Sequence, residues 1–126
     1  MKIGHTFVFV FGSNSAGRHG KGAAKYAADY FGAERGVGRG RTGNAYAIPT
    51  KDDNLGVRPW EFIEEDIRDF IEYAKERAIA DPLEIFVFTP VGCGLAGYSV
   101  DRLKKTIKRS GGLPPNVLLS NTWIDH

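Results

Sequence analysis

Two short runs of apolar residues predict the central strands of a sheet. Residues 6–11 (TFVFVF) and 84–89 (EIFVFT) are rich in β-branched and aromatic residues and show no regular alternation with polar ones. Such runs are typical of strands that are buried on both faces. Shorter apolar runs at residues 45–49 and 116–119 predict two further strands.

Helical periodicity separates these strands. Small residues share one face of residues 22–31, and apolar residues recur every three or four positions from Pro59 to about Ala80. A third helix is expected after Ser99, a residue type that favours the N-cap position. Strands that alternate with helices predict an α/β layered fold with a largely parallel sheet. We find no repeat or linker and expect one domain over residues 1–126.

Composition limits the class of protein. The chain has 126 residues, of which 42% are apolar and 25% charged, as in ordinary globular domains. Its single cysteine, Cys93, excludes a disulfide framework or a cysteine-based zinc site within one chain and fits a reducing cytoplasm. No apolar run is long enough to cross a bilayer, so we expect no membrane association.

Glycine and positive charge gather in the same parts of the chain. Of 16 glycines, nine lie between Gly12 and Gly43 and three between Gly92 and Gly97. Residues 15–41 carry six basic and two acidic residues, although the net charge of the whole chain is only +2. Glycine lets the backbone approach a ligand closely, and basic surroundings suit an anionic ligand such as phosphate.

Both glycine-rich loops follow a predicted buried strand and precede a predicted helix. In open α/β sheets, ligands bind outside the carboxyl ends of the strands, and amides at a helix N-terminus bind anions. Two such loops at one sheet edge are therefore predicted to hold a ligand with two phosphates. Neither loop matches the phosphate-binding signature of P-loop NTPases or of dinucleotide-binding dehydrogenases.

The two loops together resemble those of macro domains. Residues 11–24 (FGSNSAGRHGKGAA) are similar to the first ligand loop of that family, and residues 92–97 (GCGLAG) to its second, phosphate-binding loop. With the run AIPTKD at residues 47–52, the chain looks most like a small phage or prophage branch of macro-like proteins. The resemblance implies a three-layer α/β/α fold. It also implies that the protein is located in the cytoplasm of a bacterial host.

The resemblance also implies the ligand, which would be ADP-ribose, a related nucleotide or an ADP-ribosylated macromolecule. The second loop would wrap the diphosphate and the first would hold the distal ribose, without a metal or other cofactor. Some members hydrolyse ADP-ribosyl bonds or ADP-ribose 1″-phosphate, and others only bind. The ligand-binding residues expected here are Ser13, Asn14, Gly17, Arg18, Gly20, Lys21, Gly22, Thr50, Lys51, Gly92, Cys93, Gly94, Leu95, Ala96 and Gly97.

Three residues are candidates for catalysis, each with a plainer alternative. Asn14 would orient ribose hydroxyls or cap a turn, His19 would act as an acid or base or be an ordinary loop histidine, and Asp52 would be a general base or a turn residue. Cys93 is a conceivable nucleophile, but a neutral spacer is the favoured interpretation. The sequence leaves open whether the protein is an enzyme, and its oligomeric state.

An alternative function is nucleic-acid binding through the basic segment Arg35–Arg41 and the helix segment Lys104–Arg109. The stretch Arg35–Gly43 (RGVGRGRTG) contains no aromatic residue for base stacking, so we interpret it first as a flexible flap over the ligand cleft. Trp123 is expected to pack against the sheet edge in preference to stacking on a base. A structural phage component is a third alternative.

Overall fold

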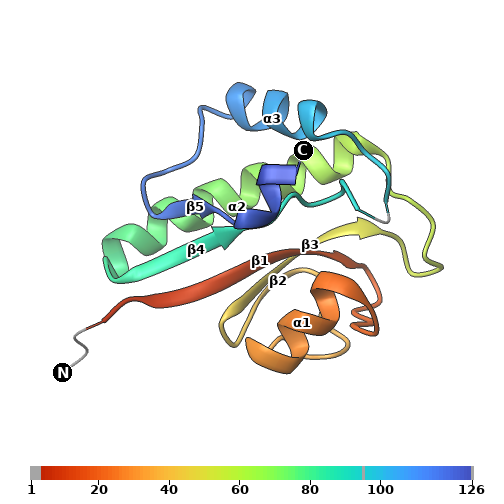
Figure 1. Ribbon diagram of the computed structural model, residues 1–126, viewed down its shortest axis with the longest axis horizontal. Helices are drawn as coiled ribbons and strands as arrows, with labels where there is room; N and C mark the ends of the chain where they lie inside the picture. Colours follow the sequence, from red (N-terminus) through yellow and green to blue (C-terminus); the bar gives the residue numbers. More distant parts are fainter. Residues whose placement is uncertain (1–3, 95, 126) are drawn as a thin grey trace.

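A five-stranded sheet with helices on both faces forms the fold (Figure 1). The computed structural model describes residues 4–94 and 96–125. The sheet order is β2-β3-β1-β4-β5, and every neighbouring pair is parallel except β2 with β3. In chain order the elements are β1 (Thr6–Asn14), α1 (Gly22–Tyr30), β2 (Gly40–Thr42), β3 (Ala45–Lys51), α2 (Trp60–Ala80), β4 (Glu84–Phe88), α3 (Val100–Arg109), β5 (Val117–Leu119) and the 3-10 helix η1 (Asn121–Asp125).

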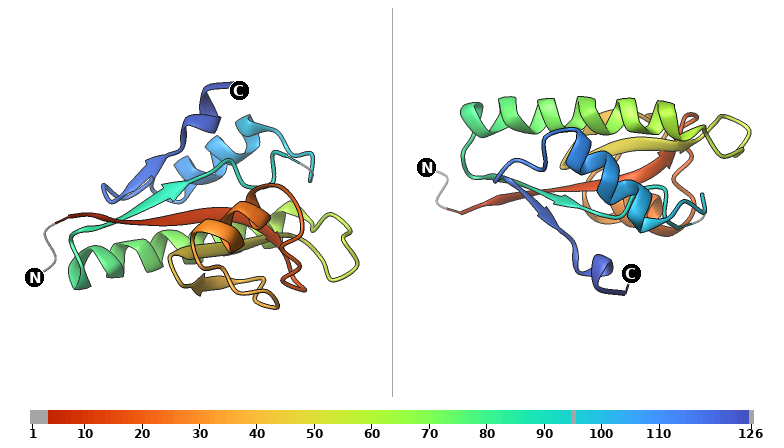
Figure 2. Two further views of the ribbon diagram at one scale, coloured as in Figure 1. Left: turned by 60° about the horizontal axis from the view of Figure 1, so that its bottom comes forward. Right: turned by 90° about the horizontal axis from the view of Figure 1, so that it is seen from above.

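The side chains of β1 divide between two apolar clusters. Val8 and Val10 are fully buried in the larger cluster, which α2 and α3 cover. Phe11 packs in a smaller cluster with Ala24 and Ala27 of α1. Because successive side chains of a strand point to opposite faces, this division places α1 opposite the other two helices. In Figure 1, α1 lies below the sheet and α2 and α3 lie above it, and Figure 2 gives two further views of this arrangement. The predicted three-layer α/β/α fold with a largely parallel sheet is confirmed.

The connections leave the two central strands in opposite directions. After β1 the chain enters α1 on one face of the sheet, and after the neighbouring strand β4 it enters α3 on the other face. Neighbouring parallel strands whose connections diverge in this way leave a crevice at their carboxyl ends, where ligands of open α/β sheets bind. The two glycine-rich loops follow these two strands.

The segment between α1 and β3 differs from its prediction as a flap. Residues 40–42 form the edge strand β2, and Arg41 forms an ion pair of 2.9 Å with the buried carboxylate of Glu84. Earlier in this segment, the amide of Gly36 donates to the carbonyl of Gly17, in the first loop, over 2.9 Å. Residues 32–43 therefore belong to the sheet edge and to the back of the first loop, and none of them lines the cleft described below.

A buried carboxylate joins three elements at the amino end of β4. Glu84 is 2% exposed and accepts hydrogen bonds from Arg77 of α2, at 2.8 Å and 3.2 Å, beside its ion pair with Arg41 of β2. Burial by itself raises the pKa of a carboxyl group, but the two guanidinium groups outweigh it and hold the pKa of Glu84 below its usual value.

Two smaller features concern the C-terminal part of the chain. Trp123 is buried against the edge of the sheet, as predicted, and its indole N–H donates to the carbonyl of Phe88 over 2.6 Å. The short helix η1 around it has no counterpart in the sequence prediction. Within the residues that the structure describes, no helix combines the length and apolar character needed to cross a membrane.

Candidate functional site

A cleft of about 1090 Å³ opens at the carboxyl ends of β1 and β4. Phe9 and Gly12 of β1 and Val87 of β4 contribute to its lining on the sheet side. The first turns of α1 line it on one side, and residues 120–122, which follow β5, line it as well. The cleft therefore lies where the diverging connections leave the face of the sheet open.

The two glycine-rich loops meet in this cleft. A Cβ atom on Gly12 of the first strand would lie 3.6 Å from the amide nitrogen of Gly92 in the second loop. It would also lie 3.5 Å from the side chain of Thr50, at the end of β3. Gly12, Thr50 and Gly92 are each about forty residues apart along the chain, and in the fold they lie within van der Waals distance of one another.

Asn14 shapes the first loop from within. Its side-chain oxygen accepts from the amide of Arg18 over 2.9 Å, and its side-chain nitrogen donates to the carbonyl of Arg18 over 2.8 Å. Both ends of the amide are used by the loop backbone, as in the turn-capping interpretation of this residue. The bonds hold Arg18 beside the cleft that it lines.

Neighbouring turns and an aromatic anchor hold the second loop. The amide of Tyr98 donates to the carbonyl of Gly92 over 2.8 Å, and the Tyr98 hydroxyl donates to the carbonyl of Arg58 over 2.6 Å. The Tyr98 ring packs on Trp60 at the start of α2, with centroids 4.8 Å apart. Half-buried Cys93 lies inside this loop, and burial raises the pKa of its thiol. A protonated thiol fits the spacer interpretation better than the nucleophile.

The charge lining the cleft has one sign. Arg18, Lys21 and Lys51 line it, and no aspartate or glutamate does among the described residues. The N-terminus of α1 also faces the cleft through Gly22 and Ala23, and no side chain hydrogen-bonds to cap it. Unpaired amides at a helix start carry partial positive charge, which adds to that of the cations.

An aromatic surface along the sheet face was missed by sequence reasoning. Phe9 stacks on Phe31 with ring centroids 5.0 Å apart, and Tyr26 of α1 lies 5.2 Å from Phe9. All three residues line the cleft, and Tyr26 remains 49% exposed. The available signal was that Phe9 must point to the opposite face from Val8 and Val10, toward the helix that carries Tyr26.

Most of the predicted ligand residues come together. From the first loop, the cleft lining includes Ser13, Asn14, Arg18, Gly20, Lys21 and Gly22. From the end of β3 and from the second loop it includes Thr50, Lys51, Gly92, Cys93, Gly94 and Ala96. Gly17 and Gly97 do not line it, and Leu95 lies outside the described residues. Gly17 instead packs against the backbone of Gly36 and Val37.

Two of the catalytic candidates lie away from the cleft lining. His19 is 1% exposed, with its ring edge against Phe11 and its Nε2 atom 3.0 Å from the carbonyl of Glu34. The carboxylate of exposed Asp52 accepts from the amides of Asn54 and Gly56, over 2.9 Å and 2.8 Å, which is the turn role. The described residues also contain no group of three His, Cys, Asp or Glu side chains placed to hold a metal ion.

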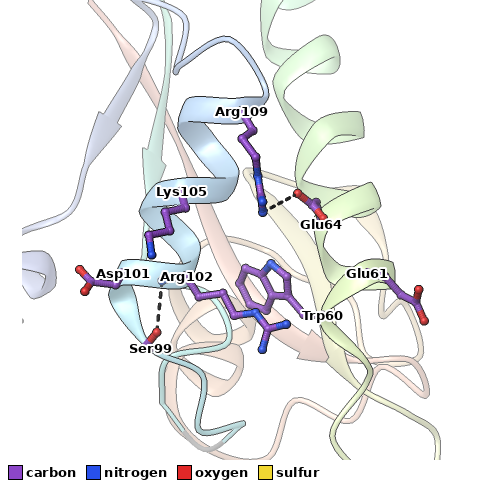
Figure 3. Close-up of a pocket in the computed structure, with 8 residues that line it drawn as sticks. All are labelled: Trp60, Glu61, Glu64, Ser99, Asp101, Arg102, Lys105 and Arg109. Atoms are coloured by element: carbon purple, nitrogen blue, oxygen red, sulfur yellow. Dashed lines mark hydrogen bonds and ion pairs between the residues drawn. The ribbon is translucent and has the colours of Figure 1, made fainter.

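A second, smaller groove of about 620 Å³ separates α2 from α3 (Figure 3). Its lining mixes acidic and basic side chains: Arg109 pairs with Glu64 over 3.2 Å, and the Arg102 guanidinium lies 5.7 Å from the Trp60 ring centroid. Ser99 caps α3 by accepting from the amide of Arg102 over 3.2 Å, as predicted. The lining thus contains three acidic and three basic side chains, so its charge does not favour an anion.

Comparison with known proteins shows similarity in fold alone. No family model and no curated protein sequence matches the chain. Two solved structures of Bacteroides thetaiotaomicron proteins are similar, the first described as a protein of unknown function and the second as a structural-genomics crystal structure. The first is 15% identical with a TM-score of 0.58, over 94% of this chain and 88% of that one. The second is 16% identical with a TM-score of 0.54, over 94% and 92%.

Proposed function

We propose that the cleft binds an ADP-ribose-like nucleotide diphosphate. The observation that carries the proposal is the union of both glycine-rich loops in one cleft whose charged lining residues, among those described, are Arg18, Lys21 and Lys51. Cations and free helix amides stabilise phosphate, and glycine-rich turns let the backbone approach it. The resemblance of both loops to those of macro domains supports the same ligand.

The aromatic surface favours a nucleotide over an inorganic polyphosphate. Phe9, Tyr26 and Phe31 offer ring faces and edges at one part of the cleft, and bases stack on such side chains with little dependence on sequence. A ligand with a flat base and a diphosphate would use both the aromatic and the cationic parts of the lining. Ser120 and Thr122 also line the cleft, and their hydroxyl groups are hydrogen-bonded to each other over 2.6 Å.

The residues that line the cleft support binding of the ligand without its hydrolysis. A general base for hydrolysis must lie within hydrogen-bond reach of the attacking water. The described lining residues include no carboxylate and no histidine. Both side-chain amide atoms of Asn14 are hydrogen-bonded to the backbone of the loop. The protein is therefore proposed as a nucleotide-recognition module.

Nucleic-acid binding through the segment Arg35–Arg41, one of the two basic segments named for it, is less well supported, because the arginines of this segment are engaged within the protein. Arg39 pairs with the buried carboxylate of Asp66, and Arg41 pairs with Glu84. Arg35 donates to the carbonyl of His19 over 3.0 Å. Arginines held by internal partners are less available to phosphates of a nucleic acid than the three cations in the cleft.

Titration calorimetry with ADP-ribose tests the proposal. Gly94 lines the cleft, and a Cβ atom there would meet nothing within 4 Å, so Gly94→Glu adds a carboxylate to the site without a backbone clash. We expect wild-type binding in the micromolar range, about −8 kcal/mol, and loss of at least tenfold in affinity in the variant through charge repulsion. Gly4→Glu is the matched control, since Gly4 is equally open and lies outside the cleft. Absence of wild-type binding at millimolar ADP-ribose would contradict the proposal.

A further inference from the structure

Part of one face of the sheet has no helix over it. On the face that carries α1, the buried cluster beneath this helix contains residues of β1 and β3 and, among those described, none of β4 or β5. In Figure 1, α1 lies below β1 toward the right, away from β5. Parallel sheets in proteins are normally covered on both faces, so an open part of this kind is unusual.

Apolar side chains from three neighbouring strands occupy the open part. Phe7, two positions before Phe9 on the same face of β1, pairs with Ile85 of β4. In the next row, Phe9 pairs with Val87, which pairs in turn with Leu118 of β5. Phe7 is 51% exposed and Leu118 is 52% exposed, and neither belongs to a buried cluster.

Tyr30, at the end of α1, borders the same surface. The carbonyl of Phe31 accepts from the amide of the residue just before β3, so α1 ends toward the amino ends of the strands. Tyr26 lies 5.2 Å from Phe9, and the Tyr30 ring lies 4.9 Å from that of Tyr26. Four helix residues rise ~6 Å and two strand residues ~6.6 Å, which places Tyr30 level with Phe7. Tyr30 is 72% exposed.

We call Phe7, Tyr30, Ile85 and Leu118 the open patch. None of the four lines the cleft, so a nucleotide bound there would leave them uncovered. The open patch contains no charged side chain, and two of its four residues are aromatic. The buried centre of protein–protein interfaces has this composition, and contiguous exposed apolar patches mark such interfaces.

The size of the open patch fits a second copy of the chain as its cover. At ~200 Å² for an aromatic side chain, the exposed parts of Phe7, Tyr30 and Leu118, with Tyr26 beside them, amount to about 450 Å². An interface that is ~60% apolar then buries about 750 Å² per partner, against ~800 Å² in a standard stable complex. Two-fold dimers are the commonest oligomers, and a single patch on each copy is enough to form one.

We propose that the chain forms a two-fold symmetric dimer through the open patch. The face that α1 leaves open on β4 and β5 is then covered by the same face of the second copy. Val87 lines the cleft and pairs with Leu118, so the second copy also borders the cleft on this side. The inference is independent of the proposed function, because the open patch lies outside the cleft lining and its test uses no nucleotide.

Sedimentation velocity tests the inference. Between about 1 µM and 100 µM, the mass of the wild-type protein should rise from that of one chain toward that of two, with a micromolar dissociation constant. Leu118→Lys and Tyr30→Lys should each raise this constant about tenfold or more, because each places an unpaired charge in the interface. Both positions are more than half exposed in the single chain, so lysine leaves the fold intact. Ile79→Lys is the matched control, since Ile79 is 88% exposed on α2, which covers the other face of the sheet.

Three outcomes would overturn the inference. Wild-type protein with the mass of one chain at about 100 µM would show that a second copy does not cover the open patch, which would leave it for a different protein. A dimer that neither variant weakens would show that the copies associate through another surface. Equal weakening by Ile79→Lys would show that the effect does not depend on the open patch.

Discussion

Gly38 is the residue at which the absence of a side chain matters most for the shape of the site. A Cβ atom there would lie 2.1 Å from the carbonyl oxygen of Asn14 and 2.9 Å from the backbone of Ser15. The hydroxyl of Ser13, next to Asn14 in the chain, donates to the Gly38 carbonyl. The segment before β2 therefore packs directly on the back of the first glycine-rich loop.

Gly38→Ala should consequently destabilise the protein. The added methyl group meets backbone atoms that cannot rotate away, so the free energy of unfolding should fall by about 2–3 kcal/mol, as for an overpacked core. Gly20→Ala serves as the control, since Gly20 is exposed and has nothing within 4 Å of its Cβ position. Urea unfolding of the two variants measures the difference. Equal stability of the two variants would contradict the close contact.

The glycine-rich loops could be predicted as site residues because strand, loop and helix follow each other in the sequence. His19 and Asp52 could not be placed in this way. His19 turns inward against Phe11, and Asp52 turns toward its own loop amides, which depends on contacts that local sequence does not specify. The sequence did not indicate that Phe9 and Tyr26 line the cleft, because aromatic residues at these positions are also typical of an ordinary core.

At the scale of elements, strong apolar patterns located α2 and the strands β1 and β4 within a few residues. The edge strand β2 escaped prediction because its sequence, Gly40–Thr42, has no strand pattern. Pairing with β3 and the ion pair between Arg41 and Glu84 hold it in place. Short elements that depend on tertiary partners are not encoded by local periodicity.

The ionic contacts of Glu84, which connect β2, α2 and β4, should make the stability of the protein depend on pH. Because the pKa of Glu84 is lowered in the folded protein, the folded state binds a proton less readily than the unfolded state, whose glutamate pKa is about 4.3. The stabilisation is therefore complete above that pKa and is lost as the pH falls through the folded value. Glu84→Gln should cost about 3 kcal/mol at pH 7, because it leaves two guanidinium groups without their buried partner.

Urea unfolding between about pH 7 and pH 3 checks this expectation. The difference in unfolding free energy between wild type and Glu84→Gln should shrink below about pH 4.3. Glu76→Gln, an exposed position on α2, should leave the profile of the wild type unchanged. A difference between wild type and Glu84→Gln that is independent of pH would contradict the ionic role of Glu84.

At the scale of the whole molecule, the cleft exists because the two faces of the sheet are covered unequally. Among the described residues, α2 and α3 cover one face, whereas α1 and the segment after β5 border the cleft on the other. Part of the sheet surface is thereby left as the floor of the cleft, beneath a rim with positive charge. The positive charges of the rim should together attract a phosphate ligand, and salt should weaken this attraction by screening.

Affinity for ADP-ribose should therefore fall with added salt. Calorimetry in about 0.05 M and 0.5 M sodium chloride should show a loss of roughly three- to fivefold, as exposed charges become screened. Lys21→Gln should weaken binding at low salt by a similar factor and flatten the salt dependence. Lys25→Gln is the matched control, since Lys25 lies on the same helix, pairs with Asp29 and does not line the cleft. A salt dependence that Lys21→Gln leaves unchanged would count against this source of affinity.

The packing of residues 36–38 on the back of the first loop bears on how relatives of this chain should be compared. Gly17 and Gly38 would be kept invariant in homologues by backbone contact alone, even in members that have changed their ligand. Gly94, with open space around it, is under no such constraint from the fold. In an alignment, invariance at position 94 would therefore report on the ligand, whereas invariance at positions 17 and 38 would report only on the scaffold.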